Sequence, residues 1–303
     1  MTMSALEEIR DLVKNSRIFE AHKKIQALPK DIAVPHDIPV EEISARIGLV
    51  QELRALASSD EKWTLQRDSD GIRTLFREMN ADGAYSIRLE GQVESPMFDV
   101  LALFHEVDLY TKWIPSYSML GVRETAILEA PSPVELITRI TCAVPPPFSD
   151  REVVIYSDGI DCLDEPDCKQ IVVLVTSIEH DKAPIGEYLV RADVIAPSGL
   201  LLTPRGDGTT DVCIIMNINP KVDVIPVWLI DLAVRNLAYL ILVAIRAASS
   251  VVKDEAYQER MRDVSHPFYS FLRKRLAESM PNQLQYLPEI DSSFESVISD
   301  LPE

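Results

Sequence analysis

Basic side chains are scarce in this sequence. Lys and Arg number 30 against 48 Asp and Glu, which gives a formal net charge of −18 at pH 7 and a pI near 4.7. An acidic surface repels the phosphates of nucleic acids and of anionic lipids over about a Debye length. The imbalance argues against a nucleic-acid partner, and we interpret it as a means of keeping the protein soluble.

Cysteine and histidine are also few, and their positions form neither a metal site nor a catalytic motif. The sequence has 4 cysteines and 5 histidines. Cys162 and Cys168 are the cysteines nearest to each other, and no second pair follows at zinc-ligand spacing. The scattered histidines match no metalloprotease or Cys–His signature. We therefore expect free thiols in a reducing compartment, no metal, no cofactor and no enzymatic activity.

Residues 1–24 are charged and amphipathic and have no apolar core of the signal-peptide kind, so we expect a cytoplasmic protein. One long apolar run, 222–252, needs a membrane test. It contains Asp231, Arg235 and Arg246, and each charge at a bilayer centre costs about 2.5–3.5 kcal/mol. On a helical wheel its apolar residues cluster within an arc of about 100°. The run therefore predicts a helix that covers a core with one face.

The hydrophobic period changes along the chain. Helical spacing covers 4–28 and 40–58, and alternation begins at Trp63 with an Asp70-Gly71 hairpin turn. A strand at 85–94 precedes a helix at 95–114, with Ser95 as N-cap and Pro96 at its first position. Further strands are predicted at 118–129, 134–143, 151–158, 170–179, 186–196 and 210–219. Helices follow at 225–248 and 253–279, the second broken or kinked at Pro267.

Consecutive antiparallel strands form a strongly curved sheet, and a long helix closes its apolar face. Where the strand side chains leave space unfilled, a cavity remains between sheet and helix. The order of elements thus predicts a container.

Six segments resemble, in order and spacing, those of START (StAR-related lipid-transfer) domains. They are WTLQRDSDGIRTLFRE from Trp63, VDLYTKWIP with Trp113, PPPFSDREVVI (145–155), TSIEHDKAP (176–184), VRADVIAPSGLLLTP (190–204) and NINPKVDVIPVWLID (217–231). The resemblance implies an α+β helix-grip fold, in which a curved antiparallel sheet wraps around a long C-terminal helix and one lipid lies between them. It also implies non-catalytic lipid binding and transfer, or lipid sensing. We divide the chain into an N-terminal helical extension (1–58), the START-like domain (59–250) and a C-terminal helix with an acidic tail (251–303).

The sequence differs from the family at the positions that the resemblance assigns to binding of the lipid headgroup. Sterol carriers of the family use a buried acid–base pair, and Thr138 and Ser157 stand at the matching positions. Phosphatidylcholine carriers use Arg and Asp beside the helix-end Trp, whereas Tyr110 and Ile114 stand around Trp113 here. Because an unpaired charge in an apolar tunnel is costly, we expect a ligand with a neutral or small polar head.

The predicted ligand-binding residues lie on one face of two neighbouring strands, on a third strand, before the helix-end Trp113 and on the apolar face of the long helix. They are Tyr110, Thr138, Ile140, Cys142, Val153, Ile155, Ser157, Ile195, Ile230, Val234, Leu237, Ala238, Ile241 and Ile245. Packing of ordinary core remains the alternative for each of them, and we interpret Trp113 itself as a core residue at the end of its helix.

Two other functions remain open. The N-terminal helices could bind a protein partner, with the lipid acting as a regulator, or the same fold could hold a pocket enzyme. A carrier also needs transient membrane contact, for which the basic run Arg273-Lys274-Arg275 is a candidate, with a solvated helix end as the alternative.

Overall fold

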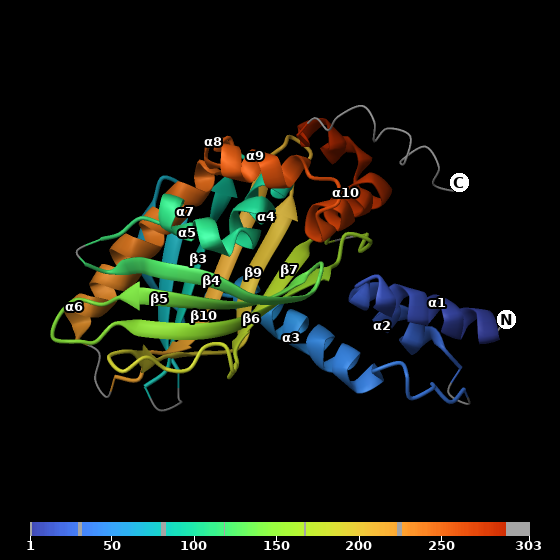
Figure 1. The fold of residues 1–303 in the computed structure, drawn as a ribbon, viewed down its shortest axis with the longest axis horizontal. Coiled ribbons are helices and arrows are strands. Elements are labelled where there is room, and N and C mark those ends of the chain that lie inside the picture. The colour runs from blue at the N-terminus through green and yellow to red at the C-terminus, as the bar shows by residue number, and fades with distance from the viewer. Residues whose placement is uncertain are drawn as a thin grey trace.

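The computed structural model describes residues 2–29, 32–79, 83–117, 119–166, 168–222 and 226–288. A large sheet forms the middle of the molecule (Figure 1). The N-terminal helices lie on one side of this sheet, and the later helices lie on the other side. The end of the predicted C-terminal segment, 289–303, lies outside the described residues.

The sheet has ten strands in the order β1-β2-β3-β10-β9-β7-β6-β5-β4, with the short β8 beside β6. The strands are β1 (Thr64–Ser69), β2 (Ile72–Glu78), β3 (Tyr85–Val93), β4 (Gly121–Ser132), β5 (Glu135–Ala143), β6 (Arg151–Asp161), β7 (Ile171–Ser177), β8 (Val190–Arg191), β9 (Asp193–Pro204) and β10 (Thr210–Asn219). All pairs are antiparallel except β6 with β8. The predicted strand 186–196 is wrong, because its sequence divides between a loop, β8 and the start of β9.

The N-terminal extension consists of α1 (Thr2–Lys14), α2 (Ile18–Ala27) and α3 (Val40–Ser58). The prediction of one helix over 4–28 is wrong, since the chain turns at Ser16, whose φ is 57°. Such a positive φ ends a right-handed helix. The two short helices then fold against each other, and α2 also packs against α3.

The predicted helix 95–114 is interrupted. It consists of α4 (Met97–His105), a 3₁₀ turn η1 (Val107–Leu109) and α5 (Tyr110–Trp113). Ser95 is not its N-cap. Its hydroxyl instead accepts a hydrogen bond from the backbone N–H of Ser249, 3.1 Å away, and so ties the start of α4 to the C-terminal helices.

The long helix after the sheet runs through α6 (Val227–Ile230), a π-helical stretch η2 (Asp231–Leu237) and α7 (Ala238–Arg246). Its middle and end pack on β1, β2 and β3. The Tyr239 hydroxyl donates to Asp70 in the hairpin turn at 2.7 Å, and Arg246 Nε donates to the Gln92 carbonyl at 3.0 Å. The helix-grip α+β fold expected from the sequence is thereby confirmed.

Four shorter helices follow the long one: α8 (Ala248–Val251), α9 (Glu255–Arg262), α10 (Pro267–Ser279) and the 3₁₀ helix η3 (Pro281–Tyr286). As predicted, Pro267 separates two helices, and it occupies the first turn of the second. By length and composition alone, the helix Trp228–Arg246 is long and apolar enough to cross a membrane. In this structure its packing against the sheet buries about a third of that stretch.

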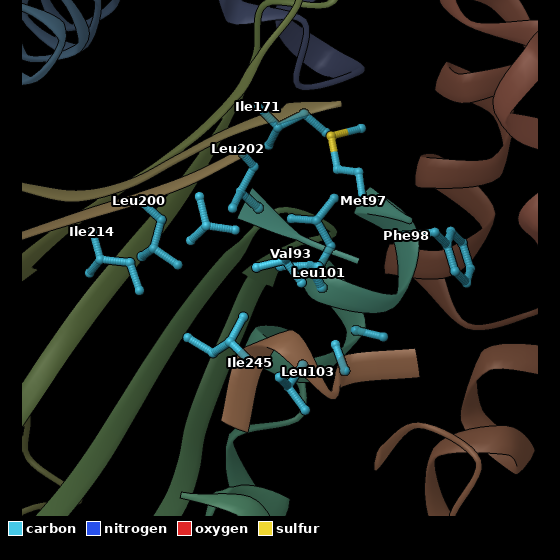
Figure 2. Packing of buried hydrophobic residues seen from close by; sticks show 14 of the residues in the cluster. Val93, Met97, Phe98, Leu101, Leu103, Ile171, Leu200, Leu202, Ile214 and Ile245 are labelled. Atoms are coloured by element: carbon cyan, nitrogen blue, oxygen red, sulfur yellow. The ribbon is translucent and has the colours of Figure 1, made fainter. Parts of the chain in front are cut away.

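Two apolar cores occupy the two faces of the sheet. The first lies between the sheet, α4 and the C-terminal helices, and Figure 2 shows Met97 near Ile171 and Leu202, with Phe98 turned toward the helices. In the second core, α3 packs on the opposite face of the sheet. Because successive side chains of a strand point to opposite faces of the sheet, the strands contribute residues to both cores.

Loss of packing in the second core is measurable with a single substitution. Leu53 of α3 is fully buried there, so Leu53→Ala is expected to lower the free energy of unfolding by about 2–5 kcal/mol. The exposed neighbour Glu52 provides the control: Glu52→Ala is expected to change the free energy of unfolding by no more than about 0.5 kcal/mol. Urea unfolding followed by circular dichroism measures both. Equal effects of the two substitutions would show that α3 does not depend on this core.

Candidate functional site

A cavity of about 300 Å³ lies within the first core. Six strands (β3, β5, β6, β7, β9 and β10) line it on one side, and the segment α4 to α5, the long helix and α10 line it on the other. The wall residues are Leu89, Leu101, Phe104, His105, Val107, Tyr110, Trp113, Ile114, Val134, Leu136, Thr138, Ile140, Ile155, Ser157, Gly159, Asp161, Ile171, Val173, Val175, Leu200, Ile214, Met216, Ile241, Phe268, Phe271, Leu272 and Arg275.

Strand alternation decides which residues of β5 and β6 reach the cavity. Thr138 lies opposite Ile155 and Leu136 lies opposite Ser157, and all four line the wall. On β6, the intervening Asp158 and Ile160 face the N-terminal helices instead. Among them, burial raises the pKa of Asp158 to about 6, although Arg46 of α3 pairs with it at 2.5 Å.

The structure brings together one part of the predicted ligand-binding set. Residues of that set in the cavity wall are Tyr110, Thr138, Ile140, Ile155, Ser157 and Ile241. Cys142 and Val153 continue the same strand faces beyond the wall, toward the 144–150 loop. Burial raises the pKa of the Cys142 thiol to about 11, which keeps the thiol neutral at physiological pH.

Other members of the set lie outside the wall, namely Ile195, Ile230, Val234, Leu237, Ala238 and Ile245. The long helix packs on β1 to β3, and its residues Ala238 and Ile245 belong to the first core without lining the cavity. Of the described residues of this helix, Ile241 lines the cavity. On β9, Ile195 lies next to Val194, which belongs to the first core, and alternation turns Ile195 away from it.

Aromatic rings that sequence reasoning did not assign to the site form much of the opposite wall. Trp113 meets Phe104 edge-on at 6.1 Å between ring centroids, and Tyr110 at 5.6 Å. Tyr110 donates its hydroxyl to the Phe104 carbonyl at 2.7 Å. Trp113, interpreted from sequence as core, is buried and also lines the cavity. Its indole Nε1 has no hydrogen-bond partner among the described residues.

Helix α10 contributes a further wall that the sequence did not predict. Phe268, Phe271, Leu272 and Arg275 line the cavity from this helix. Their spacing places them on one helical face, which is a signal present in the sequence. What the sequence did not reveal is that this face returns to the cavity, because the contact joins segments more than a hundred residues apart.

One end of the cavity wall is charged, because Asp161 and Arg275 both line it. Arg275 Nε donates to Asp161 of β6, and both side chains are almost completely buried. Arg275 also pairs with Asp164 at 2.7 Å and with Glu278 one helical turn away. Thr138 and Ser157, which the resemblance places where sterol carriers have charges, are uncharged wall residues, and the charged pair comes from other positions.

Near α10, His105, Glu106 and His266 carry ligand atoms within 4.8 Å of one another. This is the single such group of possible metal ligands among the described residues. Glu106 already accepts from the Tyr269 hydroxyl at 2.7 Å and pairs with Arg260. Burial lowers the pKa of His105 to about 3, and its ring stacks on Phe268 at 3.8 Å. At neutral pH His105 therefore presents an uncharged ring to the cavity.

Comparison with known proteins agrees with this architecture. The structure is similar to human STARD10, with a TM-score of 0.59, 18% identity, and coverage of 80% of this chain and 90% of that one. It is also similar to human StAR-related lipid transfer protein 5, with a TM-score of 0.57, 17% identity, and coverage of 71% and 100%. No curated protein sequence matches. The START domain family model matches residues 49–251, more than half of the chain, and the protein therefore belongs to the START domain family.

Proposed function

We propose that this protein is a non-catalytic carrier that binds one lipid, or another apolar small molecule, in the cavity. Its family and fold are those of lipid-binding and lipid-transfer domains. The observation that carries the proposal is the cavity itself, whose wall is aliphatic and aromatic except for a few polar side chains. Its volume lies at the lower end of the roughly 300–1,000 Å³ typical of small-molecule sites. A single small ligand fits this space.

The chemistry of the wall favours binding over catalysis. Its titratable groups are either neutral or paired: His105 is uncharged, Asp161 pairs with Arg275, and burial raises the pKa of Tyr110. Nucleophilic or acid–base catalysis needs a group activated by a neighbouring base or held near the working pH. The described wall residues offer neither arrangement.

We propose transient membrane contact through the end of the molecule where β6 begins. Large apolar side chains are exposed there, with Tyr188 at 82%, Ile185 at 55% and Trp228 at 48%. Trp228 packs near Phe148, and the Val190 N–H donates to the Asp150 carbonyl, which joins the 144–150 and 183–190 loops to the start of α6. Tyr and Trp are the side chains that partition best into the membrane interface.

The basic run 273–275 does not support the membrane contact. Arg275 is buried in ion pairs, and Arg273 lies over the Phe98 ring at 5.1 Å. An apolar contact also suits the acidic net charge, since it requires no attraction to anionic headgroups. The four cysteines are unpaired, which suits the proposed cytoplasmic location.

The alternative of a partner-binding N-terminal extension has less support. Ile43, Ile47, Val50 and Leu53 of α3 are all buried in the second core. Helix α3 therefore braces the back of the sheet, and its apolar face is not free for another protein. A role in which bound lipid regulates contacts of the exposed helix faces stays open.

The carrier proposal predicts one apolar ligand per chain in native mass spectrometry of the purified protein. Ser157→Trp places a large ring in the cavity and is expected to remove the bound ligand or lower its occupancy at least tenfold. Ser250→Trp, at an exposed position of α8, is the matched control and should retain the ligand. Circular dichroism checks that both variants fold. A wild-type chain that stays empty after exposure to mixed lipids contradicts the proposal.

The membrane contact predicts a selective loss of transfer. Trp228→Ala combined with Tyr188→Ala is expected to slow lipid transfer between neutral phosphatidylcholine vesicles by roughly 10-fold, because apolar area at the contact is lost. Ligand affinity should be unchanged, as neither side chain lines the cavity. Leu65→Ala, an exposed apolar residue on β1, provides the control and should leave transfer unaltered. Equal transfer rates in all three proteins would exclude this surface.

A further inference from the structure

The charged end of the cavity has the properties of a recognition site for one polar group. Asp161 and Arg275 both line the wall, and their side chains are only 6% and 3% exposed. Removing two charges from water is costly unless further hydrogen bonds satisfy them. A purely apolar wall would serve to hold a hydrocarbon, so this pair indicates a ligand with a polar end.

The pair retains hydrogen-bonding capacity. A guanidinium has five N–H donors, and Arg275 uses three nitrogens toward Asp161, Asp164 and Glu278. Asp161 accepts from Arg275 through one oxygen and from the Leu163 N–H, 2.9 Å away, through the other. Because a carboxylate offers about four acceptor positions, it has room for another donor. One side of the pair can donate and the other can accept.

The floor of the cavity leads to this pair along β6. Ile155, Ser157, Gly159 and Asp161 are alternate residues of the strand and all line the wall. At about 3.4 Å per residue, Ser157 and Asp161 lie roughly 14 Å apart along the strand. Gly159 carries no side chain between them, and a Cβ there would meet Val134 at 3.3 Å. The floor thus offers a narrow apolar path that ends at the charged pair.

The charges around Arg275 select the type of polar group. Three carboxylates, Asp161, Asp164 and Glu278, surround its guanidinium, and Asp164 is shared with Arg17 at 2.9 Å. A second anion, such as a carboxylate or a phosphate, would be repelled by these groups. A primary ammonium has no lone pair with which to accept from Arg275, and it would bury a further charge. A hydroxyl is neutral, accepts from an Arg275 N–H and donates to Asp161.

We propose that the cavity binds a neutral lipid alcohol whose hydroxyl lies between Asp161 and Arg275, with its hydrocarbon along the β6 floor. This inference rests on the proposed carrier function and adds the class of ligand. Because α10 lies beyond the family-matched residues 49–251, the Arg275 half of this site comes from the C-terminal segment of the chain.

The test compares ligands that differ only in the head. Displacement of Nile red from the full chain is measured with 1-decanol, decyl methyl ether, decanoate and decylamine. The alcohol is expected to bind at least 10-fold more tightly than each of the others, since the ether cannot donate, the decanoate meets three carboxylates and the ammonium cannot accept from Arg275. If decanoate, decylamine or the ether equals the alcohol, the alcohol proposal is overturned while the carrier function stands. If Nile red and all four compounds fail to bind, the carrier function fails as well.

Substitution of Asp161 then tests whether the charged pair causes the preference for the alcohol. Asp161→Leu removes the acceptor and leaves Arg275 paired with Asp164 and Glu278, and the preference for decanol over its ether is expected to fall below 3-fold. Asp181→Leu, at an exposed loop position, is the matched control and should keep the full preference. Retention of Nile red binding shows that each variant keeps its cavity. If Asp161→Leu does not fold, Arg275→Lys, which keeps the charge but loses the planar fork, decides in its place. If the folded variant keeps the full preference for decanol over its ether, the hydroxyl binds at another place in the cavity and the proposal is overturned.

Discussion

The alternation of side chains along β6 is the constraint on which the rest of the structure depends. One face of this strand lines the cavity, while the other meets the N-terminal helices through Asp158 and Ile160. Because the strand period is two residues, a slip of one residue would exchange the two faces and place Asp158 in the cavity. The second core therefore holds the sheet in the register that keeps the cavity wall apolar.

A cluster of ion pairs joins the N-terminal helices and α10 to the charged end of the cavity. Asp164, in the β6–β7 turn, pairs with Arg17 between α1 and α2 and with Arg275 of α10. Glu278 lies within 3.7 Å of Arg17 and also pairs with Arg275. Because desolvation offsets much of the attraction in such pairs, their net contribution to stability is small, and here their effect is to hold the Arg275 side chain in place. The guanidinium that faces the cavity is thus positioned by Asp161 and Asp164 inside the family-matched region together with Glu278 outside it.

Local patterns predicted most elements and a part of the cavity wall. The predicted Asp70-Gly71 turn and the predicted break at Pro267 are confirmed, because turn and proline geometry are local properties. The wall positions on β5 and β6 followed from period two once one face was chosen. Of the apolar residues of the long helix that were predicted to bind the ligand, Ile241 lines the cavity and the others lie outside its wall. The face that carries them is apolar whether it meets a strand or a cavity, and only the packing of the helix on β1 to β3 distinguishes the two.

The sequence by itself determined the acidic surface, the alternating sheet, the long amphipathic helix and the family. These properties depend on residue type and on spacing over a few residues. Tertiary structure decided which side chains enclose the cavity and what its polar end contains. Asp161 and Arg275 are separated by more than a hundred residues, and neither the neighbours nor the spacing of either residue indicates the other. Their meeting depends on how α10 returns to the sheet after two breaks in the helical chain, a path set by the packing of the first core.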